Sequence, residues 1–309
     1  MKAALFLSLF ATALFSSQNC AENNSKTDSR QGAVGAAALE LITIVPSEAF
    51  SNYWYAGEAE ICTYDVTQER YGEIREAEQV NVFVTEDFSK IKQVKLDNPA
   101  GAGADRVPVL KYNSIRRFHT GIYDYSIMQS VFTPVSGLPT LKTTTTVQDW
   151  CGQIFIQNNL EQDGYHFQGF SYFEGEGDQD IRLPQVLLED EIWTRVRLDP
   201  SKLTLGKVIV IPSAVYTRLR HASGMPQNAD IYLEKGDQIS ILRLVYTDIS
   251  RALSIQFETA FPHKILAWEE TISNKIASKG RLKSSRKSAY WKEHANSNSP
   301  LRDSLKLHF

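Results

Sequence analysis

Short segments in which apolar and polar residues alternate constrain the fold of this chain most strongly. Residues 253–258, Leu-Ser-Ile-Gln-Phe-Glu, alternate strictly, and residues 80–84 and 207–211 are short β-branched runs. A period of two places successive side chains on opposite faces of a strand. Such segments recur from Ala59 to Trp268 and are separated by several X-Pro pairs. The pattern predicts a mainly β protein, an antiparallel meander that forms a half-barrel, a barrel or a sandwich.

Turn residues predict two hairpins within this meander. One joins residues 231–233 to 239–244 through a turn that contains Gly236, and the other joins 60–68 to 79–85 around residues 70–73. A few short helices are also expected, at residues 50–55 and 127–132, with a moderate helical tendency at 271–277 that Gly280 ends.

The first residues have the composition of a secretory signal. Lys2 is followed by an apolar stretch from Ala3 to Phe15 and then by polar residues up to Cys20. This stretch is too short to cross a bilayer, which takes about 20 residues. The signal predicts export to the periplasm or the outer membrane. Four segments are expected: a signal peptide at 1–20, a flexible tether at 21–38, a single β-rich domain at 39–274 and a basic C-terminal tail at 275–309.

Cys20 lies where a lipoprotein signal places its acylated cysteine. The polar tether that follows is typical of such anchors, so we expect Cys20 to be the lipid attachment site and a membrane to be a partner. The preceding Ser17-Gln18-Asn19 matches that cleavage site poorly. Ordinary cleavage near Ala21, which leaves a soluble periplasmic protein, is the alternative.

Positive charge is concentrated at the C-terminal end. Residues 275–309 contain nine Lys or Arg and two acidic residues, in a chain whose net charge is −3. A basic tail on an acidic body binds acidic headgroups or nucleic acid, folds back on its own domain or stays solvated. We expect one of the last two, and no nucleic-acid partner, because the chain carries an export signal.

Motifs for known catalytic chemistries are incomplete in this sequence. Ser171, in Gly-Phe-Ser-Tyr-Phe, lacks the second glycine of a nucleophile elbow. The six histidines include no pair at metal-ligand spacing. His166 is expected to be an ordinary sheet residue.

An acidic loop is the most suggestive stretch for chemistry. Glu174, Glu176, Asp178 and Asp180 alternate with Gly175, Gly177 and Gln179. Four carboxylates on a flexible loop suit calcium, which takes six to eight oxygen ligands, although the spacing is not that of an EF-hand. The alternatives are a solvated hairpin turn and the catalytic carboxylates of a hydrolase, which would line a cleft beside His166 or Arg195.

Cys151 follows a run of threonines and lies between Trp150 and Gly152. A nucleophilic cysteine needs a histidine partner and an electropositive niche, and the threonines predict a strand. In that strand Trp150 and Cys151 would lie on opposite faces, with Gly152 allowing a bend or a close approach. A disulfide with Cys62 after export and two buried free thiols are the alternatives for this cysteine pair.

Five stretches together resemble a family of exported proteins from Gram-negative bacteria that is often labelled septum formation inhibitor. They are residues 52–60 (NYWYAGEAE), 69–75 (ERYGEIR), 120–126 (TGIYDYS), 149–152 (DWCG) and 171–177 (SYFEGEG). The resemblance covers nearly the whole body and implies a protein of the cell envelope, without an activity. The label is shared with cytoplasmic nucleotide pyrophosphatases of α/β fold, whose phosphate motif Ser-x-Ser-Pro-Arg-Arg is matched here only by Ser299-Pro300-Leu301-Arg302.

Three functions follow from these observations. The first is an envelope protein without a catalytic site that binds an apolar or amphiphilic ligand, or an envelope partner, on the concave face of its sheet. The second is an envelope hydrolase that uses the loop from Glu174 to Asp180, with or without calcium. The third is the nucleotide pyrophosphatase that the family label suggests, which would require an α/β fold.

Overall fold

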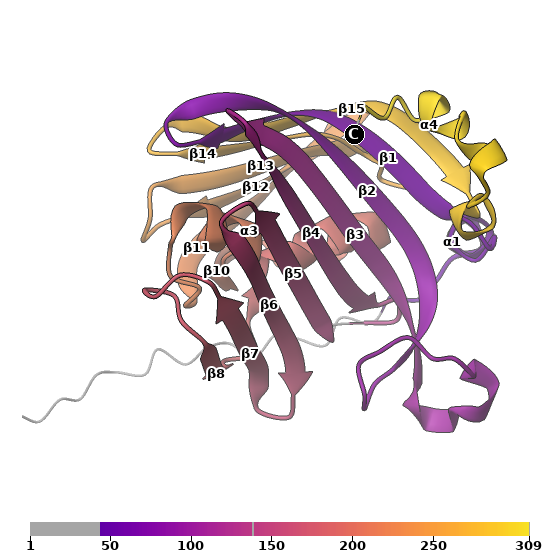
Figure 1. Cartoon of the computed structure of the whole chain (residues 1–309). Helices are drawn as coiled ribbons and strands as arrows, with labels where there is room; N and C mark the ends of the chain where they lie inside the picture. The colour runs from indigo at the N-terminus through magenta and orange to yellow at the C-terminus, as the bar shows by residue number, and fades with distance from the viewer. Residues whose placement is uncertain (1–43, 138, 309) are drawn as a thin grey trace, which may run out of the picture. The chain divides into compact units, whose positions relative to one another are not determined.

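Consecutive hairpins build the sheet that dominates this structure (Figure 1). The computed structural model describes residues 44–137 and 139–308. Within these residues fifteen strands form one mixed sheet, in the order β8-β7-β6-β5-β4-β3-β2-β1-β15-β14-β13-β12-β11-β10-β9. Each hairpin is antiparallel, β1 also pairs antiparallel with β15, and β9 pairs parallel with β10. The expected mainly β meander is confirmed, as an open sheet.

The elements have the following bounds. The strands are β1 Ala59–Arg70, β2 Glu73–Ser89, β3 Arg106–Thr120, β4 Tyr123–Pro134, β5 Lys142–Asp149, β6 Gly152–Glu161, β7 Gly164–Ser171, β8 Gln179–Leu183, β9 Leu187–Leu188, β10 Gly206–Ile211, β11 Gln227–Glu234, β12 Ile239–Tyr246, β13 Arg251–Glu258, β14 Ile265–Ile272 and β15 Lys275–Ser288. The α-helices are α1 Glu48–Trp54, α2 Ile192–Leu198, α3 Ala214–Arg220 and α4 Leu301–Ser304. The 3-10 helices are η1 Pro99–Gly101, η2 Gly103–Asp105, η3 Glu189–Glu191, η4 Pro200–Lys202, η5 Tyr290–Lys292 and η6 Asn296–Asn298.

The two edges of the sheet are β8 and β9, and only residues 184–186 separate these strands in sequence. One apolar cluster joins the two edges: Tyr165 and Leu183 from the β7–β8 side pack with Leu188 and Ile211 from the β9–β10 side. The sheet therefore curls until its edges lie close together, and side chains rather than a strand ladder hold the seam.

Helix α2 fills the interior of the curled sheet. All seven of its residues are buried, and Ile192, Trp193 and Val196 belong to one cluster with residues of β1–β4 and of β10–β14. The sequence predicts a ligand on the concave face of the sheet, but α2 occupies the part of this face formed by β1–β4 and β10–β14. A cavity of about 40 Å³ remains beside α2, lined among others by Arg116 and Arg251, which is space for a few water molecules only.

A buried ion pair fixes α2 to the sheet. The Arg197 guanidinium donates two hydrogen bonds to the Glu60 carboxylate, one of them 2.8 Å long, and packs against the rings of Trp54 and Phe83. Tyr53 donates a further hydrogen bond to Glu60. Burial acts to raise the pKa of Glu60, but the charge and hydrogen bonds of Arg197 outweigh it and lower this pKa to about 2.

A second group of buried charges precedes α2. The Glu189 carboxylate accepts a 2.6 Å hydrogen bond from Arg251, and Glu191 pairs with Arg195 at 2.9 Å. Asp190 lies between these glutamates and accepts a hydrogen bond from the Ala214 backbone at 3.3 Å. Burial, helped by the neighbouring Glu189 charge, raises the pKa of Asp190 to about 6.

Several local predictions are confirmed. The expected helix at residues 50–55 is α1: the Ser47 hydroxyl caps it by accepting a hydrogen bond from the Phe50 backbone at 3.0 Å. Both expected hairpins are present, as β1–β2 and as β11–β12.

The helix expected at residues 127–132 is wrong, because this segment lies within β4. Tyr125, Ile127 and Val131 are buried on the inner face, whereas Met128 is exposed on the outer face. The segment therefore follows a period of two, and its cross-strand pairing with β3 and β5 overrides a weak helical propensity.

The separate basic tail is also corrected. Residues 275–288 are β15, which lies between β1 and β14 inside the sheet, so the domain continues past residue 274. Ser273 and Asn274, both with positive φ, form the two-residue turn of the β14–β15 hairpin in place of the helix expected there. Gly280 is the cross-strand partner of Trp268, whose ring occupies the space that a Cβ would need.

Some basic residues of this segment pair with the acidic body. The Lys283 ammonium lies 3.0 Å from the Asp65 carboxylate, and Lys279 lies 3.9 Å from Glu269. This agrees with the alternative in which the segment folds back on its own domain. The signal peptide, the tether and Cys20 lie outside the described residues. No described helix is long and apolar enough to cross a membrane.

Glu60→Gln should destabilise the protein by about 3–5 kcal/mol, because it leaves the buried Arg197 charge unpaired. The matched control is Glu73→Gln, which removes an exposed ion pair with Arg75 and should cost less than about 1 kcal/mol. Urea unfolding at pH 7 measures both values. The folded-state pKa of Glu60 is lowered, so its contribution is present above pH 4.5 and is lost as the pH falls toward 2. Equal effects of the two variants would contradict this role of the pair.

Asp190→Asn should flatten the pH dependence of stability. The folded-state pKa of Asp190 is raised from 3.8 to about 6, so the folded protein binds the proton more tightly than the unfolded chain. The wild type should therefore lose stability as the pH rises from about 4 to about 6, by about 2 kcal/mol more than the variant. Urea unfolding at several pH values measures this difference, and parallel curves for the two proteins would refute it.

Candidate functional site

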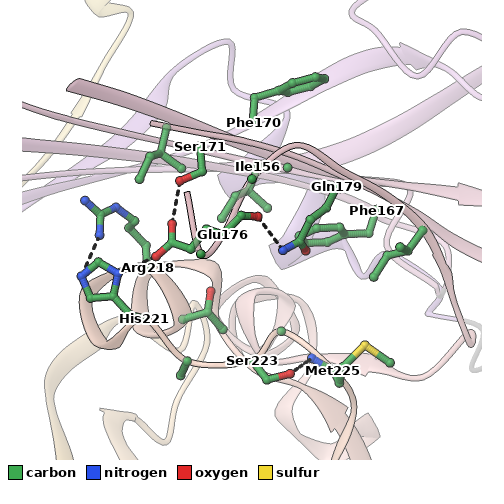
Figure 2. Close-up of a pocket in the computed structure, with 18 residues that line it drawn as sticks. Ile156, Phe167, Phe170, Ser171, Glu176, Gln179, Arg218, His221, Ser223 and Met225 are labelled. Carbon is green, nitrogen blue, oxygen red and sulfur yellow. Dashed lines mark hydrogen bonds and ion pairs between the residues drawn. The ribbon is translucent and has the colours of Figure 1, made fainter. Parts of the chain in front are cut away.

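A ligand-sized space lies beside α3, on the inner side of the sheet. It has a volume of about 350 Å³ and lies between the inner face of β6–β8 and the C-terminal end of α3 with the loop after it (Figure 2). Ile154, Ile156, Phe167, Ile181 and Met225 supply apolar side chains to its wall. We call this space the α3 pocket.

A chain of polar side chains forms one side of the α3 pocket. The Ser171 hydroxyl donates to the Glu176 carboxylate at 2.7 Å, and the other oxygen of Glu176 lies 2.5 Å from His221 Nδ1. Because a carboxylate only accepts, His221 Nδ1 carries the proton. Nε2 is then the acceptor for Arg218 Nη1, at 3.4 Å. The side chains thus form one ordered row, Ser171–Glu176–His221–Arg218, which Figure 2 shows.

Arg218 is the least satisfied member of this row. Its side chain is 2% exposed and lies over the Phe173 ring at 4.4 Å, with the Asp149 carboxylate at 3.7 Å. Its Nε has no hydrogen-bond partner among the described residues. Burial lowers the pKa of Arg218, although the charge of Glu176 acts in the opposite direction. A buried cation with such long contacts leaves hydrogen-bonding capacity unused.

The backbone around α3 explains how Arg218 and His221 reach the pocket. Ser213 caps the start of α3 by accepting from the Val215 backbone, and His221 ends the helix in the left-handed conformation at φ 50°. Arg70 fastens the end of the helix by donating to the Leu219 carbonyl. The same guanidinium donates to the Tyr125 hydroxyl at 3.2 Å.

The Trp-Cys-Gly stretch forms the turn of the β5–β6 hairpin, so the strand expected there is corrected. Trp150 and Cys151 are the two turn residues and both are exposed. The Asp149 carboxylate accepts from the Cys151 backbone at 2.7 Å and stops the strand. Gly152 does allow a close approach: a Cβ there would lie 2.7 Å from Cγ of Tyr172.

Both described cysteines are free thiols. Cys62 is buried in β1, where its thiol donates to Glu60 and lies 3.4 Å from the Ser285 hydroxyl, and burial raises the pKa of Cys62 to about 12. Cys151 is exposed in its turn. The structure therefore contains no Cys62–Cys151 disulfide. The alternative of two buried free thiols holds for Cys62 only, because Cys151 is exposed.

The acidic loop does not gather its carboxylates at one point. Glu176 turns into the α3 pocket, whereas Asp180 lies on β8, 2.7 Å from His166 Nε2, and Glu174 and Asp178 are exposed. Among the described residues no three His, Cys, Asp or Glu side chains lie close enough together to hold a metal ion. The carboxylates separate because residues 173–177 form a turn, after which β8 begins. Arg195 does not contact this loop. It forms a buried ion pair with Glu191 instead.

Sequence reasoning missed Arg218 and His221, because neither belongs to a motif and His221 lies 45 positions from Glu176. A signal was nevertheless present. Four of the five stretches that carry the family resemblance meet here: Arg70, Tyr125, Asp149 and Glu176 each come from a different one. These contacts bring segments that are distant in sequence together beside the α3 pocket.

No protein-family model matches the chain, and no curated protein matches it either. One solved structure is similar in fold, a crystal structure described as a β-barrel-like protein of domain of unknown function DUF1849 from Brucella abortus. The two proteins are 7% identical in sequence, with a TM-score of 0.45 over 74% of this chain and 97% of that one.

Gly152→Ala should destabilise the protein by about 1–2 kcal/mol, because the new methyl group would displace the Tyr172 ring at its Cβ and Cγ. Gly175→Ala is the matched control, since a Cβ at Gly175 meets no atom within 4 Å. Urea midpoints of both variants decide the matter. A Gly152→Ala protein as stable as the Gly175→Ala protein would show that Tyr172 does not pack on this glycine.

Proposed function

We propose that this protein binds a small amphiphilic molecule in the α3 pocket. The observation that carries the proposal is the composition of this space: about 350 Å³, with apolar side chains from the sheet and from the loop after α3, and with the Ser171–Glu176–His221–Arg218 row along one side. Pockets of roughly 300–1,000 Å³ with a few converging polar groups are typical of small-molecule sites.

The ligand is held by its two halves in different ways. Its apolar part packs against Ile154, Ile156 and Phe167, which the strands already hold in place. Its polar end reaches the row of hydrogen-bonding side chains, where Arg218 Nε has no hydrogen-bond partner among the described residues. The row is fixed in advance by its own contacts, so little side-chain entropy is lost when the ligand binds.

The cellular setting of this proposal comes from the sequence. The apolar stretch before Cys20 is that of an export signal, and an acylated Cys20 would tether the domain to a membrane of the cell envelope. The resemblance to exported proteins labelled septum formation inhibitor fits the same setting. A membrane-tethered domain that binds amphiphiles would meet its ligands at the membrane surface.

The hydrolase alternative, which uses the carboxylates of the loop from Glu174 to Asp180, finds less support in the geometry. Of these carboxylates only Glu176 lines the α3 pocket, whereas Asp180 contacts His166, and Glu174 and Asp178 are exposed. Glu176 itself lies between Ser171 and His221 and contacts both. This arrangement suits a polar anchor for a ligand, so we propose binding rather than hydrolysis.

The proposal is tested with N-phenyl-1-naphthylamine, a neutral amphiphile that fluoresces in apolar sites. We expect saturable binding to the wild type and displacement by decanol or decanoate. Met225→Trp, which fills the pocket from its loop, should weaken binding about tenfold or more, as expected for about 1–3 kcal/mol of overpacking. Mass spectrometry of small molecules that co-purify with the native protein identifies the natural ligand.

Val245→Trp is the matched control for this substitution. Val245 is a partly exposed apolar residue of β12 that does not line the α3 pocket, and its replacement should leave probe binding unchanged. Probe binding that is absent in the wild type, or that both variants weaken equally, would refute the α3 pocket as the site.

A further inference from the structure

The outer face of β4–β7 carries a second surface, on the opposite side of the strands from the α3 pocket. Strand register places Met128, Thr146, Phe155 and Phe170 in one row across these four strands. The next row contains Ser126, Gln148 and Gln153. Figure 2 shows Phe170 on the far side of the strands from Glu176. We call this surface the outer platform.

Aromatic rings form the centre of the outer platform. The Phe155 and Phe170 rings are cross-strand partners with centroids 6.5 Å apart and planes 19° apart. Phe170 is 47% exposed and Tyr172, further along the same face, is 64% exposed. These rings line a groove of about 360 Å³ together with the amides of Gln148 and Gln153. Exposed rings grouped in this way are unusual unless they bind something.

The rings are held in position before any ligand arrives. Tyr172 lies on the bare Cα of Gly152, where no side chain keeps it away. Phe155 and Phe170 project from paired strands rather than from loops. A rigid platform of this kind loses little entropy on binding.

The polar groups beside the rings are mostly neutral amides, with one carboxylate. Gln148 and Gln153 are exposed, and among the described residues their side-chain amides have no hydrogen-bond partner. Asp178 is the one charged side chain that lines the groove within the described part of the chain. The outer faces of β1 and β15 differ, since they carry ion pairs such as Lys283–Asp65. The absence of cations in the groove argues against nucleic acid and anionic lipid.

We propose that the outer platform binds a neutral glycan. The C–H faces of sugar rings pack on flat aromatic side chains, and their hydroxyl groups both donate and accept hydrogen bonds, as glutamine amides and threonine hydroxyls do. Asp178 is the single charged side chain that lines the groove among the described residues, and the other polar groups are neutral, which suits an uncharged sugar chain. An open groove on a sheet face also lets a polymer extend past both ends. This site is separate from the α3 pocket and does not depend on the function proposed for it.

Affinity electrophoresis of the whole domain tests the proposal, in native gels that contain hydroxyethylcellulose, laminarin or dextran. At least one of these neutral glycans should retard the wild type. Phe155→Ala and Phe170→Ala should each weaken the interaction about fivefold or more, as for a buried contact residue at a binding surface. Tyr232→Ala, which removes a half-exposed ring on β11, should leave it unchanged.

Three outcomes would overturn the proposal. These are no retardation by any of the neutral glycans, retardation only by the charged glycan alginate, and binding to phosphatidylcholine vesicles that Phe155→Ala abolishes in place of glycan binding. Thermal unfolding of each variant reports whether it folds, and both phenylalanine variants should fold because their rings are partly exposed. Phe155→Ala should also leave N-phenyl-1-naphthylamine binding unchanged, which separates the outer platform from the α3 pocket.

Discussion

The Glu60–Arg197 ion pair determines what the interior of this sheet can hold. Arg197 belongs to α2, every residue of which is buried, and its guanidinium packs against Trp54 of α1 and Phe83 of β2. A buried guanidinium without a carboxylate would cost several kcal/mol, so α2 is stable inside the sheet only where Glu60 meets it. One contact therefore ties α1, β1, β2 and α2 together and keeps the helix in the centre.

Filling the interior with α2 leaves ligand-sized space beside α3 rather than beside α2. The space beside α2 is only about 40 Å³, whereas the α3 pocket is about 350 Å³. The short connection from β8 to β9 contributes to this arrangement, because it leaves a seam where no strand pairs and where the loop after α3 can face β7 and β8.

The alternation of apolar and polar residues was enough to predict the fold class, and turn residues were enough to predict two hairpins, because both features are local in the sequence. The alternation did not predict β15, because the many basic residues of this strand hide the pattern of apolar and polar positions. In the structure some of these residues pair with acidic residues of other strands, as Lys283 does with Asp65. Glu60 and Arg197 lie 137 positions apart, and Glu176 and His221 lie 45 apart. Such contacts depend on which strands become neighbours, and nothing local in the sequence records that. The turn at Asp149 could have been predicted from the sequence, because Asp-Trp-Cys-Gly has the spacing of an Asx turn.

The β6–β7 hairpin connects the two surfaces for which we propose ligands. Ser171 faces the α3 pocket, and its neighbours Phe170 and Tyr172 line the outer groove. Because successive residues alternate in direction, one strand contributes side chains to both surfaces. The turn before β6 adjoins both surfaces: Asp149 accepts a hydrogen bond from the Cys151 backbone and also faces Arg218 beside the pocket, and Tyr172 packs on Gly152 directly after this turn.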